Sequence, residues 1–307
     1  MSSQPTSRVA LRSPRSAWAT IALLSTLLAG AGCAGRAGAD RVAPAVPFPS
    51  PDAVGGGCPK TVAAAGDMNQ LTATQATGKL AQGSHADVVA VLGDQQYPAG
   101  SLTDYRTKYD RTGWGQLKAK TRPVPGNHEY MTPGATGYFT YFGHPPAYYA
   151  YNLGCGWRGY ALNSEVGIAD QARWLRVDLA AHPTASVLAY WHKPRYSSGT
   201  KHGSNPALQP FWDALAHRRG VILNGHEHNY ERFAPRGGMR EFVVGTGGSA
   251  TYPFASNPVA GSVKRIAHTP GILILIVQAN GSYNWSFRNR ASGVLDSGQS
   301  PWANRPI

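Results

Sequence analysis

Five short polar blocks in this chain carry side chains that can bind metal ions. They begin at Gly66, Gly93, Gly126, Trp191 and Gly225, and each ends or closely follows an apolar or β-prone run. The donor groups are carboxylates, an amide and imidazoles, supplied by Asp67, Asp94, Asn127, His192, His226 and His228. Hard oxygen ligands mixed with imidazoles suit first-row ions such as iron, zinc or manganese. The blocks therefore predict a metal centre assembled from loops.

The chemistry that such a centre favours is the displacement of a phosphoryl group. An aspartate has two oxygens and can bridge two ions. Two ions roughly 3.5 to 4 Å apart can clamp the attacking and the leaving oxygen of the displacement. Glycine precedes each aspartate, the asparagine and the first histidine of the last block, which lets the backbone turn sharply and approach the ions closely.

The elements that must position these groups can be read from the apolar runs. Strand-like runs occupy residues 61–65, 88–92, 186–191, 221–223, 241–244 and 271–278. Several runs are apolar on both faces, which favours sheets covered on each side. Helical patterns cover residues 70–82, 169–181 and 208–217, and residues 148–153 and 157–163 are typical of a hairpin. The six donors lie at or just beyond C-terminal strand ends, the edge that holds the ligand site in α/β sheets.

The ordered blocks resemble the calcineurin-like metallophosphoesterases, and within them the purple acid phosphatases. Residues 225–232 resemble the G-H-x-H-x-Y-E-R block of that subgroup, residues 93–97 its G-D-x-x-Y block, and residues 126–129 its G-N-H-[DE] block. The similarity covers about residues 60–250. It implies an α/β fold in which two mixed β-sheets pack as a central sandwich flanked by helices.

The resemblance also implies which residues hold each ion. The first ion would be bound by Asp67, Asp94, Tyr97 and His228, and the second by Asp94, Asn127, His192 and His226, with Asp94 bridging. A tyrosine binds metal usefully only as phenolate, which favours ferric iron paired with Fe(II), Zn or Mn. Asn69 departs from the family, because the wider superfamily has Asp-x-His here and the purple phosphatases usually have Asp-x-Gly.

Residues beside the ligand blocks receive roles by the same resemblance. His128 would contact the substrate phosphate and stabilise the charge of the transition state, and His202 would protonate the leaving alcohol. Arg195 and Tyr196 are candidate substrate contacts, as are Lys193 and Arg232, whereas Glu129 and Glu231 are expected to brace the loops by hydrogen bonds. The expected reaction is in-line attack on a phosphomonoester by a metal-bound hydroxide, without a covalent phosphoenzyme.

Two other functions fit the same residues. One is a phosphodiesterase of the same fold that acts on nucleotides or lipid head groups. The other is a non-catalytic protein that binds metal or phosphate at the cell surface. The loops at residues 100–115 and 131–148 are the candidate walls of the substrate site, and their sequence indicates no specificity.

The N-terminus is typical of an export signal. Arg8, Arg12 and Arg15 precede an apolar stretch over residues 17–29, which predicts a signal peptide over residues 1–33. A Pro/Gly-rich linker over 34–57, a catalytic domain over 58–292 and a loose tail over 293–307 would follow, with no transmembrane segment in the mature chain. After cleavage of the signal peptide, the mature protein would be extracellular, periplasmic or attached to the cell surface.

The expected state of each of the three cysteines depends on its position relative to this signal peptide. Cys33 lies at its end and is either lipid-modified or removed. Cys58 and Cys155 are then expected to form a disulfide in an exported protein, with free buried thiols as the alternative.

The charge favours anionic partners. The formal net charge is +13, and residues 1–39 carry four arginines and no acid, so 13 − 4 leaves about +9 on the remainder. The chain has no basic run, recognition-helix pattern or stacking array, so no specific nucleic-acid partner is expected. Steering of phosphate-ester substrates explains the charge equally well.

Overall fold

The computed structural model describes residues 48, 57–291 and 293–300. These residues belong to one compact unit, Pro44–Ile307. The predicted signal peptide with Cys33, nearly all of the predicted linker and residues 301–307 lie outside the described residues.

The first sheet has six strands and carries three of the candidate donors. Its strand order is β13-β12-β11-β1-β2-β3, and β1, β2 and β3 run parallel whereas β11, β12 and β13 pair antiparallel. The bounds are β1 Lys60–Ala65, β2 Val88–Leu92, β3 Thr121–Val124, β11 Ile272–Val277, β12 Tyr283–Asn289 and β13 Gly293–Gln299.

The second sheet has seven strands in the order β10-β8-β9-β7-β6-β5-β4. Strands β5, β6, β7 and β9 run parallel, and β4, β8 and β10 pair antiparallel with their neighbours. The bounds are β4 Tyr149–Gly154, β5 Trp157–Ala161, β6 Ser186–Tyr190, β7 Gly220–Asn224, β8 Tyr230–Phe233, β9 Met239–Val244 and β10 Ser262–Ile266. Both sheets are therefore mixed, as predicted.

Helices occupy the connections between strands. The α-helices are α1 Leu71–Gly83, α2 Leu102–Thr107, α3 Gly113–Gln116, α4 Thr136–Tyr141, α5 Ile168–Ala181 and α6 Gln209–Leu215. Short 3-10 helices are η1 Tyr109–Arg111, η2 Lys118–Lys120, η3 Glu129–Met131, η4 Pro133–Ala135 and η5 Pro206–Leu208. None of the helices in the described part of the chain is both long and apolar enough to cross a membrane.

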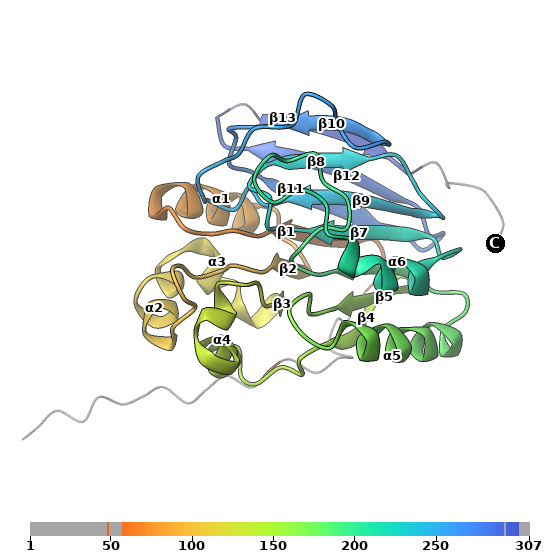
Figure 1. Ribbon diagram of the computed structural model, residues 1–307, viewed down its shortest axis with the longest axis horizontal. Helices are drawn as coiled ribbons and strands as arrows, with labels where there is room; N and C mark the ends of the chain where they lie inside the picture. The colour runs from red at the N-terminus through yellow and green to blue at the C-terminus, as the bar shows by residue number, and fades with distance from the viewer. Residues whose placement is uncertain (1–47, 49–56, 292, 301–307) are drawn as a thin grey trace, which may run out of the picture. The chain divides into compact units, whose positions relative to one another are not determined.

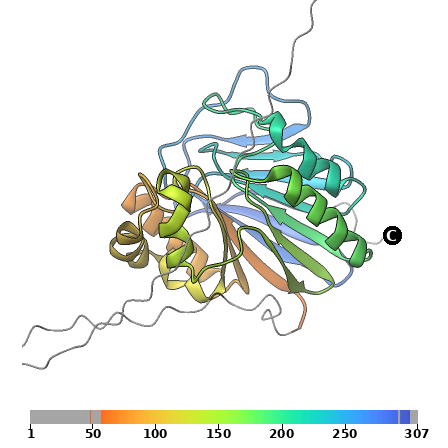
Figure 2. The ribbon, with the colours of Figure 1, turned by 60° about the horizontal axis from the view of Figure 1, so that its bottom comes forward.

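Hydrophobic packing explains why the two sheets form a sandwich with helices outside. Along β6, Leu188 and Tyr190 join the core that contains residues of both sheets, whereas Val187 and Ala189 join a second cluster with side chains of α5 and α6. Figures 1 and 2 show α5 and α6 together over the seven-stranded sheet, with α1 beside the strands of the other sheet. The strands apolar on both faces are thus buried on both faces, which confirms the predicted fold class.

Three further predictions have an outcome in the fold. The predicted hairpin is formed by β4 and β5, and Cys58 and Cys155 form a disulfide. The predicted loose tail is wrong for residues 293–299, because they form β13 and pair with β12 at the edge of the six-stranded sheet. Polar residues such as Asp296 make this edge strand resemble a tail in sequence.

Candidate metal centre

The candidate donors lie on loops that leave the C-terminal ends of parallel strands. Asp67, Asp94 and Asn127 follow β1, β2 and β3, and the three histidines follow β6 and β7 of the other sheet. Neighbouring parallel strands bring their C-terminal ends to one edge, so donors from both sheets meet there.

One donor set gathers around the Tyr97 hydroxyl. This oxygen lies 3.4 Å from Asp67 Oδ1, 3.1 Å from Asp94 Oδ2 and 3.3 Å from His228 Nε2. His228 Nε2 is also 3.3 Å from Asp67 Oδ1. These four side chains are the ones that the family resemblance assigned to the first ion.

The other set gathers around His192 Nε2. This nitrogen lies 3.3 Å from Asp94 Oδ2, 3.2 Å from Asn127 Oδ1 and 3.1 Å from His226 Nδ1. Donor atoms of Asp94, His192 and His226 all lie within 4.8 Å of one another. Asp94 Oδ2 is the atom common to both sets.

Each aspartate keeps one oxygen for this cluster by using the other in a backbone hydrogen bond. Asp94 Oδ1 accepts from the His128 N–H at 2.9 Å, and Asp67 Oδ2 accepts from the His226 N–H at 2.8 Å. These bonds fix the carboxylate planes and direct Asp94 Oδ2 and Asp67 Oδ1 to the donor cluster.

The histidines are oriented in a similar way. His192 Nδ1 lies 2.8 Å from the Leu92 carbonyl oxygen, and His228 Nδ1 lies 2.7 Å from that of Ala250. A ring N–H that donates to a carbonyl leaves the opposite Nε2 as a lone-pair donor. Both rings therefore present Nε2 to the cluster.

Unusual backbone conformations place the donors. Asp67, Asp94 and His226 have φ values of 65°, 51° and 70°, in the left-handed region that non-glycine residues rarely adopt. Gly126 makes room beside them, because a Cβ there would lie 2.2 Å from Asp94 Oδ1. The glycines of the polar blocks thus allow the close approach that the sequence indicated.

The electrostatics of the cluster favour bound cations. Asp67 and Asp94 are 0% and 2% exposed, and in the described residues neither forms an ion pair with a lysine or arginine. Burial disfavours a charged His192, but Asp94 outweighs it and raises the pKa of that imidazole to about 10, so a metal ion that binds Nε2 must displace a proton from it. Burial and the adjacent His192 lower the pKa of His226 to about 2. Buried carboxylates, an amide oxygen and oriented imidazoles fit two metal ions.

Three buried glutamates hold the surrounding loops. Glu129 accepts hydrogen bonds from the backbone N–H groups of Asp94, Gln95, Gln96 and Gly126. Glu231 accepts from the Ser198 N–H at 2.7 Å, so both glutamates expected to brace loops make such bonds. Glu227 binds the N–H groups of His202 and Gly203, a role that the sequence did not indicate.

Two histidines lie beside the donor sets without belonging to them. His128 is 23% exposed, its Nε2 lies 3.9 Å from Asp94 Oδ2, and its ring centroid is 4.0 Å from that of Tyr97. The ring of His202 stacks on His226 with centroids 4.0 Å apart. Burial lowers the pKa of His202, against the opposing effect of Glu227. The roles of these two histidines toward a substrate stay predictions.

Tyr252 is an aromatic neighbour of the centre that sequence reasoning missed. Its ring stacks on His228 with centroids 4.3 Å apart and an interplanar angle of 14°, and it lies 5.9 Å from the His202 ring. It follows β9 in a loop without a recognisable motif, so nothing in the sequence pointed to it.

Four other candidate contacts are used in packing or ion pairs. Arg195 Nε donates to Gln209 of α6 at 2.8 Å, and the Tyr196 ring packs against Trp212 of α6. Lys193 pairs with Glu165 at 2.5 Å, and Arg232 pairs with Asp296 at 2.7 Å. All four side chains thus have partners within the protein, and the roles of Arg195 and Tyr196 as substrate contacts stay predictions.

Comparison with known proteins identifies the family from the sequence, and solved structures share the fold. Residues 60–230 match the model of the calcineurin-like phosphoesterase family. Purple acid phosphatase 15 of Arabidopsis thaliana is 26% identical over 220 residues, an alignment that covers 57% of this chain and 41% of that protein. The chain thus spans less than half the length of this relative.

Solved structures share the fold at lower identity. A purple acid phosphatase from yellow lupin seeds aligns with a TM-score of 0.68 and 17% identity. The alignment covers 80% of this chain and 54% of the lupin chain. GAP50, the anchor in the inner membrane complex of Plasmodium, aligns with a TM-score of 0.65 and 15% identity. The alignment covers 79% of this chain and 88% of the GAP50 chain.

Proposed function

The chain belongs to the calcineurin-like phosphoesterase family, and we propose that it is an exported phosphatase that hydrolyses phosphomonoesters at a two-metal centre. The observation that supports this most strongly is the meeting of two complete donor sets at one oxygen, Asp94 Oδ2. A site for a single ion would not need donors on both sides of that oxygen.

In this proposal Asp67, Asp94, Tyr97 and His228 hold one ion, and Asp94, Asn127, His192 and His226 hold the other. Such ions supply an acidified water as the nucleophile and polarise the phosphoryl group. The Tyr97 phenol requires a strongly acidic ion, because burial and the two aspartates raise its pKa well above the ordinary value. We therefore propose ferric iron at that position, with Fe(II), Zn or Mn beside it. Elemental analysis and a visible spectrum of protein from its own host test this assignment.

His128 and His202 act on the substrate in this proposal. His128 Nδ1 lies against the Pro98 carbonyl oxygen, so Nδ1–H donates there and a protonated Nε2 can donate to a phosphoryl oxygen. His202 is exposed and stacks on His226, and its imidazole can carry a proton to the leaving alcohol.

The direct test is hydrolysis of p-nitrophenyl phosphate by metal-loaded protein. We expect turnover of this monoester to exceed that of the bis(p-nitrophenyl) diester, and we expect Asp94→Ala to lower it by about 10³-fold or more, because several kcal/mol of metal-derived stabilisation are lost. Asp170→Ala removes an exposed carboxylate on α5 and serves as the matched control. A preference for the diester would favour the phosphodiesterase alternative, and metal-loaded protein inert to both esters would contradict the proposal.

Export is the second part of the proposal. It is supported by the basic and apolar N-terminal pattern of the sequence and by the Cys58–Cys155 disulfide, a bond typical of oxidising compartments. Mass spectrometry of the chain recovered from its host tests it. A mature chain that starts at Cys33 with a lipid, or beyond it without one, is expected, whereas an intact N-terminus on cytoplasmic protein would contradict export.

A further inference from the structure

A cavity of about 370 Å³ adjoins the candidate metal centre through Tyr97. Its walls come from the loop between β1 and α1, from the loop after β2, and from the segment that joins α2, η1 and α3. The first two of these loops also carry Asp67 and Asp94. The cavity is therefore built partly from the segments that form the donor cluster, and its volume suits a small organic ligand.

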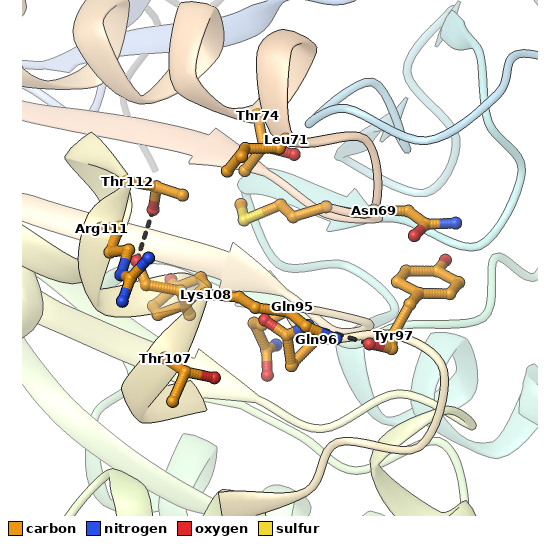
Figure 3. A pocket seen from close by; sticks show the side chains of 12 residues that line it. Asn69, Leu71, Thr74, Gln95, Gln96, Tyr97, Thr107, Lys108, Arg111 and Thr112 are labelled. Carbon is orange, nitrogen blue, oxygen red and sulfur yellow. Dashed lines mark hydrogen bonds between the residues drawn. The ribbon is translucent and has the colours of Figure 1, made fainter. Parts of the chain in front are cut away.

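The two ends of the cavity differ in chemistry. Figure 3 shows Asn69 and Tyr97 together at one end and Arg111 at the opposite end. Met68 and Leu71 also line the cavity, and Leu71 is 54% exposed although it is apolar. One end of a ligand that lies along the cavity would contact Tyr97, on the side of the metal centre. Its middle would pack against the apolar wall, and its other end would meet the positively charged Arg111.

The far end carries uncompensated positive charge. Lys108 also lines the cavity, but its ammonium group pairs with Asp104 at 2.6 Å. Arg111 is exposed, and no carboxylate pairs with it among the residues that the structure describes. Its guanidinium group is a fork of donors suited to a phosphate or carboxylate.

We propose that this cavity binds the leaving group of the substrate, and that the favoured substrate class is a phosphomonoester whose extended leaving group ends in a second anion. This inference rests on the proposed phosphatase function. The ester phosphate would lie at the donor cluster, the leaving group would pass Tyr97 and Asn69, and its terminal phosphate or carboxylate would meet Arg111. Asn69, which departs from both family patterns, would then form the entrance.

The test compares substrates that differ only at the far end. Butane-, hexane- and octanediol bisphosphates are hydrolysed in parallel with the n-alkyl phosphates of equal chain length. For the chain length that reaches Arg111, we expect kcat/KM for the bisphosphate, counted per ester group because it has two equivalent ends, to exceed that for the alkyl phosphate. Arg111→Gln should lower the bisphosphate value about fivefold, the effect of an exposed charge pair of about 1 kcal/mol, and leave the alkyl phosphate value unchanged.

Arg106→Gln is the matched control, because Arg106 is an exposed arginine of α2 that does not line the cavity. It should leave both values unchanged. Loss of activity toward both substrates in Arg111→Gln, or equal losses in both variants, would overturn the proposal. So would a wild-type protein that treats the bisphosphate and the alkyl phosphate alike at every chain length.

A binding measurement separates this proposal from the phosphatase assignment. Titration calorimetry with octane bisphosphonate and octylphosphonate, which are not hydrolysed, needs no turnover. If the wild-type protein hydrolyses no ester but binds the bisphosphonate more tightly, and Arg111→Gln removes that preference, the cavity assignment stands and the phosphatase assignment fails. Equal binding of the two phosphonates would overturn the cavity assignment itself.

Discussion

Asp94 has two oxygens with different tasks. Oδ1 accepts the His128 N–H, and Oδ2 faces donors of both sets. The sequence indicated that Asp94 is shared, because its block matches a family pattern. It could not show which oxygen is free, since the bond that occupies Oδ1 comes from a loop after another strand. In the structure only Oδ2 is directed to the donor cluster, so the bridge that we propose would use this one oxygen.

Gly126 is needed beside Asp94 for a steric reason. A Cβ at Gly126 would lie 2.2 Å from Asp94 Oδ1 and 2.8 Å from His192 Cδ2. We expect Gly126→Ala to displace both donors, and to reduce bound metal and turnover by about 10²-fold or more, as when a reacting group is misplaced by about 1 Å. Metal analysis measures the bound metal, and the rate of phosphate release measures turnover.

Gly83→Ala is the control for that substitution, because a Cβ at Gly83 would meet no atom within 4 Å. This variant should behave like the wild-type protein. Normal metal content in Gly126→Ala would show that the donors tolerate the displacement and that the close approach is not required.

Among single residues, the sequence predicted those that stand in motifs and missed those that act by tertiary contact. Asp67, His226 and His228 were predicted from their blocks. Tyr252 and Glu227 were not, because stacking on His228 and binding the amides of residues 202–203 depend on how distant loops fold together. The spacing of residues within a motif does not predict contacts between loops that are distant in the sequence.

At the level of elements, strands with two apolar faces were predicted well and edge strands were not. The runs at β1, β2 and β11 are buried and nearly all apolar. β13 is mostly exposed, so its sequence resembles a loop. Its place in the sheet depends on pairing with β12 and on Asp296, which accepts hydrogen bonds from Tyr230 and from Arg232 of β8.

Asp296→Asn should therefore destabilise the fold although Asp296 lies in the segment expected to be a tail. Removing the charge from these hydrogen bonds is expected to lower the free energy of unfolding by about 1–3 kcal/mol near neutral pH. Urea denaturation measures the difference. Asp170→Asn, which removes an exposed carboxylate that pairs with Arg173, should change it by less than about 0.5 kcal/mol.

The difference in the free energy of unfolding between the wild-type protein and Asp296→Asn should depend on pH. Burial alone would raise the pKa of Asp296, but hydrogen bonds from Arg232 and Tyr230 outweigh it and lower that pKa below its ordinary value. The stabilisation is therefore complete above the ordinary value and is lost as the pH falls through the lowered one. The wild-type protein and Asp296→Asn should converge in strongly acidic solution. Equal stability near neutral pH would contradict a structural role for β13.

At the scale of the whole molecule, the disulfide links the two sheets away from the donor cluster. Cys58 precedes β1 and Cys155 lies in the turn between β4 and β5, at the opposite ends of the strands from the ligand loops. The sequence predicted the pair from compartment and count. It could not show that the bond connects one sheet to the edge hairpin of the other.

Replacing both cysteines by serine should lower stability and leave catalysis intact. A cross-link between cysteines 97 residues apart restricts the unfolded chain, and its loss is expected to cost about 2–4 kcal/mol. Denaturation of the double variant and of reduced wild-type protein should give the same loss, with unchanged kcat for phosphate release. An unchanged free energy of unfolding, or a fall in kcat without unfolding, would contradict this assignment.

The convergence of loops from two sheets on Asp94 is the claim on which the proposed function depends. The most direct measurement is an anomalous difference map from crystals of metal-loaded protein, recorded at the iron and zinc absorption edges. We predict two peaks about 3.5–4 Å apart on either side of Asp94 Oδ2, the iron peak on the side of Tyr97. A single peak, or peaks that do not contact Asp94, would contradict the account.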